Sequence, residues 1–216
     1  MKVIITGATG MVGEGVLLEC LENNAVTKVL MVNRRPFDLK HPKLEELIIP
    51  DFMKPDGFDE NLRGYDACFY CAGVSSVGMN EEKYTAITYD TTIIFARKLS
   101  YLNPLMVFTF VSGSHTDSSE KGKIMWARVK GRTENALMKL PFKGVYNFRP
   151  GIMKAFPGQK NVKTLFRILL PVFLFLFPKG SLTLKQVGQA MINAVRRGYP
   201  RKILEINDIR QLSLSS

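Results

Sequence analysis

The sequence predicts an α/β fold built around a parallel sheet, and two observations carry that prediction. Short apolar, β-branched runs such as residues 26–33 and 105–111 alternate along the chain with segments of helical periodicity such as 11–22 and 184–195. The strand candidates are apolar almost throughout, which is typical of parallel strands covered by helices on both faces. We therefore expect a doubly wound, three-layer sandwich.

The start of the chain carries the most informative element. An apolar strand over residues 3–5 leads into the turn TGATGMVG and then into a helix over 11–22. A strand, a glycine turn and a helix in this order are typical of a dinucleotide-binding site. Gly7 allows the tight turn, Gly10 admits a diphosphate to the backbone, and Gly13 lets the helix lie close to the strand. A tight turn that binds nothing is the alternative, because the spacing is G-x-x-G-x-x-G rather than G-x-G-x-x-G.

The remaining elements continue the alternation. Further strands are predicted over 26–33, 43–50, 66–71, 105–111, 143–148 and 202–206, and further helices over 59–63, 80–102, 123–140 and 184–195. No repeat or linker divides the 216 residues, which fit a single domain over 1–216 with a small substrate-side region from about residue 152.

Five motif residues follow predicted strands, namely Gly7, Arg34, Gly73, Ser112 and Pro150. The carboxyl ends of parallel strands meet at one edge of a sheet, and ligands of open α/β sheets bind there. We therefore expect these residues to share one cleft.

The end of the second strand predicts which dinucleotide is bound. An acidic residue about twenty positions past the glycines holds the ribose 2′-hydroxyl in NAD-binding folds, and this chain has Arg34 and Arg35 there. Guanidinium groups suit a 2′-phosphate, so we expect NADP(H) to be preferred over NAD(H). A solvated pair of loop arginines is the alternative. Asp51, after the third strand, is a candidate for facing the adenine.

Bulk properties narrow the class of protein. The net charge of +11 is scattered along the chain rather than gathered in a tract, and no nucleic-acid motif is present, so we expect no nucleic-acid partner. Cys68 and Cys71 have C-x-x-C spacing, but three positions apart on a strand places them on opposite faces, as core thiols. We expect no metal site. The chain begins directly with a strand, which favours a cytoplasmic location.

The oddest segment is the apolar stretch over residues 164–177, TLFRILLPVFLFLF. It is shorter than the roughly 20 residues of a transmembrane helix, and Arg167 and Pro171 interrupt it. A buried helix or pocket wall, a homodimer interface and a peripheral membrane contact are the three interpretations that remain.

Together these motifs resemble those of the short-chain dehydrogenases/reductases, in the atypical, epimerase-like branch and its Tat-interacting-protein-like group of NADPH-binding reductases. The likeness covers nearly the whole chain and rests on the glycine turn, the double arginine, Val129-Lys130-Gly131 and FRPG at 148–151. It implies a seven-stranded Rossmann-type sheet of order 3-2-1-4-5-6-7 with the reaction at the nicotinamide. The expected cofactor site then comprises Gly7, Thr9, Gly10, Met11, Val12, Gly13, Asn33, Arg34, Arg35, Asp51, Cys71, Ala72, Gly73, Lys130, Pro150 and Gly151.

The resemblance also implies a catalytic Ser, Tyr and Lys, and here the chain departs from the family. Ser112 and Lys130 match two of these positions, with Ser114 a substitute for the first, but Trp126 stands at the tyrosine position. An indole N–H cannot act as the general acid. The family's helix asparagine is also replaced, because Thr88 stands at its position.

His115 is the best substitute proton donor, because it follows Ser112 closely and histidine titrates near neutrality. A surface-loop histidine is the alternative interpretation. Weaker candidates for the proton donor are Tyr84, Tyr89 and Tyr146.

Three functions follow. The first is an NADP(H)-dependent reductase of a small or hydrophobic carbonyl compound, whose proton does not come from residue 126. The second is an NADP(H)-binding sensor or partner-binding module without turnover. The third is a module that docks on a membrane or a partner through residues 164–177. The sequence does not name the substrate.

Overall fold

A seven-stranded parallel sheet of order β3-β2-β1-β4-β5-β6-β9 forms the centre of the computed structural model, which describes residues 1–161 and 180–215. The strand order confirms the predicted 3-2-1-4-5-6-7, with β9 as the seventh strand. The strands are β1 (Lys2–Thr6), β2 (Lys28–Asn33), β3 (Leu44–Ile48), β4 (Ala67–Tyr70), β5 (Val107–Val111), β6 (Gly144–Phe148) and β9 (Ile203–Leu204).

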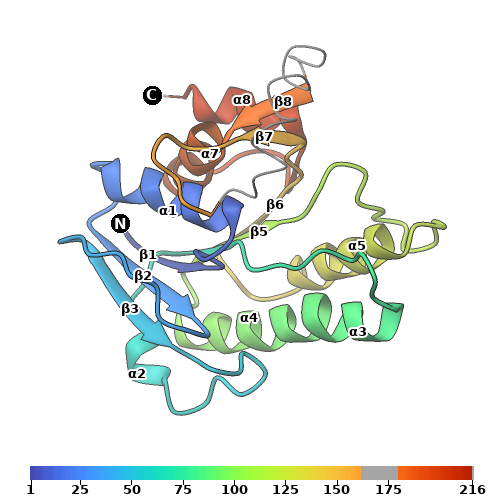
Figure 1. Ribbon diagram of the computed structural model, residues 1–216, viewed down its shortest axis with the longest axis horizontal. Coiled ribbons are helices and arrows are strands. Elements are labelled where there is room, and N and C mark those ends of the chain that lie inside the picture. Colours follow the sequence, from blue (N-terminus) through green and yellow to red (C-terminus); the bar gives the residue numbers. More distant parts are fainter. Residues whose placement is uncertain (162–179, 216) are drawn as a thin grey trace.

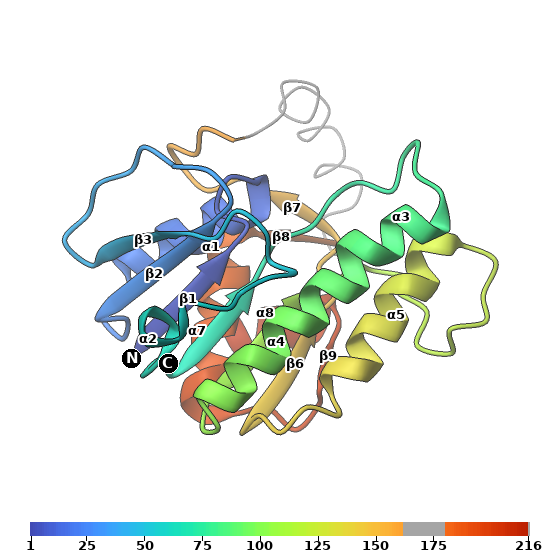
Figure 2. The same ribbon diagram turned by 90° about the horizontal axis from the view of Figure 1, so that it is seen from below.

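Helices cover both faces of this sheet, as Figure 1 shows, and make the predicted three layers. One face carries α1 (Met11–Glu22), α7 (Leu184–Arg197) and α8 (Ile206–Ser213). The other face carries α5 (Met125–Leu137) and a long helix made of α3 (Glu81–Thr85), η1 (Ala86–Asp90) and α4 (Thr91–Leu102). Figure 2 shows the long helix lying beside α5. The short helix α2 (Asp59–Leu62) precedes β4.

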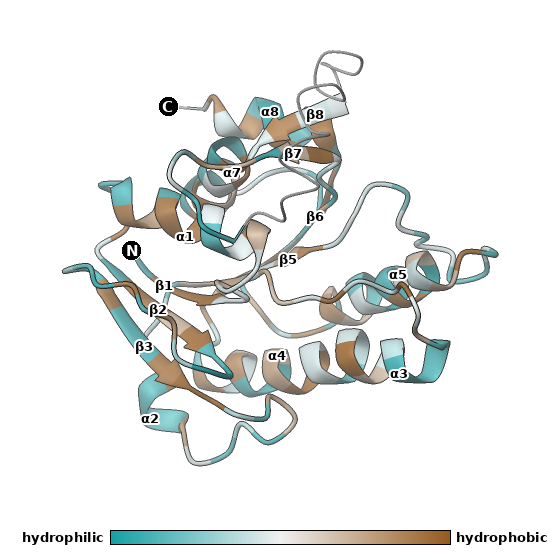
Figure 3. Ribbon diagram, viewed as in Figure 1, coloured by the Kyte–Doolittle hydropathy of each residue, from teal (hydrophilic) through white to brown (hydrophobic). Residues whose placement is uncertain are grey.

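Each face of the sheet has its own hydrophobic core, because successive strand side chains point to opposite sides. In β1, Val3 and Ile5 belong to the core beneath α1 and α7, whereas Ile4 belongs to the core beneath α4. Figure 3 shows hydrophobic residues along the inner strands. Cys68 lies in the second core and Cys71 packs against the first, which confirms that the two thiols occupy opposite faces.

The structure differs from the predicted elements near the end of the chain. A strand was expected over 202–206, but the sheet pairing stops at Leu204 and α8 begins at Ile206. A capping box between Glu205 and Asp208 starts this helix, and burial of Ile209 and Leu212 stabilises it. Two further short strands that were not predicted, β7 (Ile152–Lys154) and β8 (Ser181–Thr183), pair in parallel as a separate ribbon.

The long helix confirms the prediction over 80–102 and adds a feature that the periodicity did not show. The middle of the helix, Ala86–Asp90, is a π-helical turn with Thr88 buried at its centre. Single π turns inside α-helices occur frequently at functional sites. The apolar stretch 164–177 lies outside the described residues, so its proposed roles stay predictions. Within the described parts of the chain, every helix is too short or too polar to cross a membrane.

Candidate dinucleotide-binding site

The glycine turn between β1 and α1 has the shape that the sequence predicts. Gly7 has a φ of +73°, and a Cβ there would lie 2.5 Å from the backbone N of Ala72. A Cβ on Gly13 would lie 2.1 Å from the carbonyl O of Gly7. Both glycines are therefore needed by the chain itself, because they bring the turn against the end of β4 and the helix against the turn.

Gly10 and Gly73 differ from these two glycines. The nearest atom to a Cβ on Gly10 would be 3.4 Å away, an ordinary contact, and nothing lies within 4 Å of one on Gly73. Neither glycine has a positive φ. Packing of the chain therefore does not explain the absence of a side chain at either position. Both residues line a hollow at the carboxyl edge of β1, β2 and β4, together with Gly7, Thr9, Val32, Asn33, Arg34, Phe52, Cys71 and Ala72.

Arg34 joins this hollow to two others. It also lines a hollow with Thr9, Arg35, Pro36 and Pro50. Arg34 and Arg35 are both exposed at the end of β2. Both arginines thus line the same open space beside the glycine turn. A doubly charged phosphate group would find bidentate donors there.

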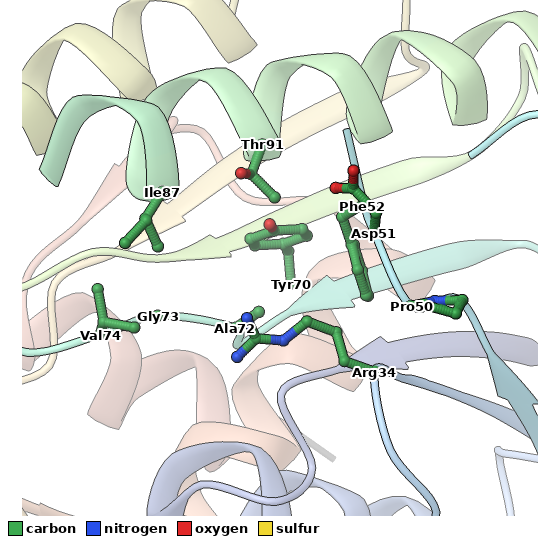
Figure 4. Close-up of a pocket in the computed structure, with 10 residues that line it drawn as sticks. All are labelled: Arg34, Pro50, Asp51, Phe52, Tyr70, Ala72, Gly73, Val74, Ile87 and Thr91. Carbon is green, nitrogen blue, oxygen red and sulfur yellow. The ribbon is translucent and has the colours of Figure 1, made fainter. Parts of the chain in front are cut away.

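The third hollow lies between the end of β3 and the long helix, as Figure 4 shows. Pro50, Asp51 and Phe52 approach it from one side and Ile87 and Thr91 from the long helix. Tyr70 lines its floor, and the Arg34 side chain extends toward Ala72. The Asp51 carboxylate accepts a hydrogen bond from the Met53 N–H at 2.9 Å. A flat, mostly apolar wall with one acidic group suits an adenine ring.

Asn33 and Glu46 position the arginine turn. The buried Asn33 side chain donates to Glu46 Oε1 at 3.1 Å, and the N–H of Phe37 donates to the same oxygen at 2.9 Å. Glu46 therefore holds both ends of the short turn that presents Arg34 and Arg35. The sequence did not indicate this role, because a glutamate in an edge strand is usually an ordinary exposed residue.

Ser112 and Pro150, which were expected in the same cleft, line none of the three described hollows, and the Ser112 hydroxyl already has a partner. Ser112 Oγ lies 2.8 Å from Thr116 Oγ1, and the Thr116 hydroxyl donates to the carbonyl O of Gly113 at 2.8 Å. A hydroxyl carries one proton, so while the Thr116 hydroxyl donates to Gly113, Ser112 is the donor between the two hydroxyls. The Ser112 side chain is 6% exposed. Its proton is thus directed at Thr116, a residue that the sequence analysis did not single out.

Lys130 lies beside Ser112 and contacts its backbone. Lys130 Nζ donates to the carbonyl O of Ser112 at 2.9 Å. Burial lowers the pKa of Lys130 to about 8, and the Glu134 carboxylate opposes that shift. The ammonium group has two remaining N–H donors, which suit the hydroxyls of a sugar.

Trp126 lies one helical turn before Lys130 on α5 and packs toward the same loop. A Cβ on Gly113 would lie 3.6 Å from Cζ3 of its ring. His115 is exposed and adopts a φ of 69°, a left-handed conformation that costs a non-glycine residue about 1 kcal/mol. It makes no hydrogen bond or ion pair with the described residues. The roles of Trp126 and His115 stay predictions.

The tyrosines considered as proton donors lie in different surroundings. The hydroxyl of Tyr146 accepts a hydrogen bond from the Tyr199 N–H at 3.1 Å, at the amino end of β9 and therefore away from the cleft. The ring of Tyr89 lies under the Arg132 guanidinium. Tyr84 is buried, and burial raises its pKa.

The segment after β6 borders the reaction end. The carbonyl O of Pro150 accepts a hydrogen bond from the Ser114 N–H at 3.3 Å. A Cβ on Gly151 would lie 2.7 Å from the carbonyl O of Gly180, so packing of the chain explains this glycine. The predicted contact of Gly151 with a cofactor stays a prediction. Arg149 forms a buried bidentate ion pair with Glu134 and anchors β6 to α5.

Cys71 and Ala72 complete the strand-end residues. Burial raises the pKa of the Cys71 thiol to about 12, so the thiol is neutral at physiological pH. The N–H of Ala72 donates to Thr6 Oγ1 at 3.3 Å, which ties the end of β4 to the end of β1. Met11 and Val12 form the first turn of α1, whose N-cap, Gly10, has no capping side chain. The N–H groups of this turn are thus available to a ligand.

Comparison with known proteins gives distant relatives. The chain is 26% identical to rat Protein HTATIP2 over 154 residues, which cover 70% of this chain and 62% of the rat protein. It is 28% identical to Protein FMP52, mitochondrial, from Debaryomyces hansenii, over 71% of this chain and 67% of that protein. The matched region is thus less than two thirds of the rat protein.

Solved structures share the fold. The Bordetella bronchiseptica enzyme WbmF in complex with NAD+ superposes with a TM-score of 0.69 at 16% identity, over 98% of this chain and 76% of that one. Yeast methylglyoxal/isovaleraldehyde reductase Gre2 complexed with NADPH superposes with a TM-score of 0.71 at 14% identity, over 95% and 77% of the two chains. The sequence profile of the NAD dependent epimerase/dehydratase family matches residues 3–122, more than half of the 216 residues. This chain belongs to that family.

Proposed function

We propose that the protein binds NADP(H) and uses it to reduce a small or hydrophobic carbonyl compound. One observation carries the proposal: three adjoining hollows share Arg34 and run from the glycine turn to the end of β3. The family is described by its use of NAD, and a structural neighbour, yeast Gre2, is a reductase in complex with NADPH. Cytoplasmic location stays a prediction, and one relative is named mitochondrial.

The residues would hold the dinucleotide along the cleft. The first turn of α1 would bind the diphosphate, because its free N–H groups and the helix dipole favour negative charge. Arg34 and Arg35 would bind the 2′-phosphate, and Asp51 would face the adenine. Lys130 would hold the nicotinamide ribose. The bound dinucleotide supplies the hydride.

The choice of NADP(H) is tested at the two arginines. The double variant Arg34→Ala/Arg35→Ala should weaken NADPH binding by about 30-fold or more, since hydrogen bonds between charged groups contribute about 1.5–3 kcal/mol each. NADH binding should change by less than about threefold, because NADH has no 2′-phosphate. Calorimetric titration of both nucleotides measures this. Equal weakening of the two would reject the 2′-phosphate assignment.

Turnover is tested by NADPH oxidation with a panel of aldehydes and ketones graded in size. A reductase should oxidise NADPH steadily with at least one member. If His115 supplies the proton, His115→Ala should slow that reaction by about 100-fold. The variant should bind NADPH with unchanged affinity, because His115 is not among the groups proposed to hold the dinucleotide.

A second function, binding of NADP(H) without turnover, is favoured by the reaction end of the cleft. The Ser112 proton is directed at Thr116, and residue 126 is an indole. A tightly held, stoichiometric nucleotide in the purified protein, together with no oxidation across the carbonyl panel, would decide for this function.

A further inference from the structure

An acid in the first turn of α1 is buried and fully paired. Glu14 is 4% exposed. One of its carboxylate oxygens accepts the N–H of Lys160 at 2.9 Å, and the other accepts the N–H of Asn161 at 2.7 Å. Burying a carboxylate is costly unless its oxygens have hydrogen-bond partners, and two backbone N–H groups supply them here.

A glutamine strengthens the same attachment. The side-chain Nε2 of Gln159 donates to the carbonyl O of Met11, and its Oε1 accepts the N–H of Phe156 at 3.0 Å. Phe156 is buried at 6% exposure. Residues 156–161 are therefore fastened to the first turn of α1, the turn in which the N–H groups are open to a ligand. We call residues 156–161 the α1-bound segment.

The α1-bound segment comes from the reaction end of the cleft. The chain leaves Pro150, which contacts Ser114, passes through β7 and then reaches α1 (Figure 1). None of the residues that line the three described hollows, which run from the glycine turn to the end of β3, belongs to it. The segment thus connects the surroundings of Ser112 to the first turn of α1 and bypasses the adenine end.

We propose that Glu14 is a positioning residue for the nicotinamide half of the dinucleotide, and this proposal rests on the proposed function. By fastening the α1-bound segment, Glu14 keeps a wall beside the diphosphate and the nicotinamide ribose. The two backbone N–H groups also offset the negative charge that Glu14 places one turn from the diphosphate. The adenine half would need no such wall, because the hollow proposed for it is lined by Tyr70, Asp51 and the long helix.

The test compares two ligands that differ in the nicotinamide half. NADPH and adenosine 2′,5′-bisphosphate both carry adenine and a 2′-phosphate, but only NADPH has the nicotinamide ribose. Glu14→Ala should raise the Kd of NADPH by about tenfold and change that of adenosine 2′,5′-bisphosphate by less than about twofold. Trypsin should cut after Lys160 faster in the variant than in the wild-type protein.

Other variants separate this role from general damage to the helix. Glu14→Gln keeps the size of the side chain but offers only one acceptor, so it should change NADPH binding in the same direction by less. Gln159→Ala removes the hydrogen bond from the α1-bound segment to Met11. It should weaken NADPH binding in the same way, and it replaces Glu14→Ala in the test if that variant does not fold. Glu22→Ala is the matched control, since Glu22 is an exposed acid on the same helix, and binding should not change.

Two results would overturn the role of Glu14. One is that Glu14→Ala weakens the binding of both ligands equally, which would mean that the whole glycine turn is damaged. The other is faster cutting after Lys160 with unchanged NADPH binding in both Glu14→Ala and Gln159→Ala. Failure of the wild-type protein to bind either ligand would instead reject the proposed function, and this inference with it.

Discussion

The ends of β1 and β2 differ from the surroundings of Ser112, at the end of β5, in how their polar groups are used. At the glycine turn, Gly10 and Gly73 leave space that the chain does not fill, and Arg34 borders every one of the three hollows. At the reaction end, the Ser112 hydroxyl donates to Thr116 and Lys130 donates to a backbone carbonyl. The glycine turn and the ends of β1, β2 and β4 thus leave open space, whereas Ser112 and Lys130 are paired within the chain and residue 126 is an indole.

On the proposed function, nucleotide binding and proton transfer rest on different groups. Binding would use backbone N–H groups, small residues and the charge of Arg34 and Arg35. Proton transfer would need a donor of suitable pKa, and residue 126 on α5, where the resemblance implies a tyrosine, is a tryptophan. Substitutions can therefore be designed to change one of these two regions and leave the other unchanged.

The largest expected effect comes from restoring the missing acid. Trp126→Tyr places a phenol one helical turn from Lys130, whose ammonium stabilises a phenolate. NADPH oxidation with an accepted carbonyl compound should rise by about 100-fold, the usual size of general acid catalysis. Adding Thr116→Val should raise it further, because valine cannot accept the Ser112 proton. Steady-state rates at saturating NADPH measure both gains.

The NADPH affinity of the same variant is the control for that experiment. The NADPH Kd of Trp126→Tyr should stay within about threefold of wild type, since tyrosine keeps an aromatic ring at this place on α5. If neither variant gains activity while both bind NADPH, more than the acid and the serine proton is missing from the reaction end.

The next effect separates glycines needed by the chain from glycines needed by a ligand. Gly13→Ala should lower the free energy of unfolding by about 3 kcal/mol, because its Cβ would lie 2.1 Å from the Gly7 carbonyl O. Gly73→Ala should lower it by less than about 1 kcal/mol, because its Cβ has open space, yet weaken NADPH binding by about tenfold. Urea unfolding and calorimetry measure the two quantities. Wild-type affinity in Gly73→Ala would mean that no ligand approaches this strand end.

The smallest effect is a pH dependence at Lys130. Burial lowers the pKa of Lys130 from the ordinary 10.5 to about 8 in the folded protein. Between these two values the unfolded chain binds more protons than the folded protein, so this group's contribution to stability rises with pH. From pH 7.5 to pH 10, the wild-type protein should gain about 1–3 kcal/mol relative to Lys130→Met. Denaturant unfolding of both proteins at the two pH values gives the difference in their free energies of unfolding. If that difference does not change with pH, the pKa of Lys130 is not lowered in the folded protein.

Much of the fold was predictable because its causes are local. The apolar runs and the glycine turn are contiguous in sequence, and the strand order followed from the resemblance that they support. The last strand was expected to run to Ile206, but Glu205 and Asp208 cap a helix there. The capping residues can be recognised in the sequence, whereas a sheet pairing of only two residues cannot.

The site was predictable only in part. The residues that follow strands could be placed at one edge of the sheet, since topology alone brings them together. Thr116, Glu46 and Glu14 were not found, because each is an ordinary residue type whose role depends on its partner. Glu14, for example, is paired with N–H groups 146 and 147 positions away. A first-turn acid also suits the helix dipole, so nothing in the sequence marks it as special.

The central claim is that the open end of the cleft binds a phosphorylated nicotinamide dinucleotide. Calorimetric titration of the wild-type protein with NADPH, and with NADH under the same conditions, tests it most directly. We predict one site per chain, and an NADPH affinity at least about tenfold above that for NADH. Absence of heat and of any rise in the unfolding temperature with both nucleotides would contradict the account.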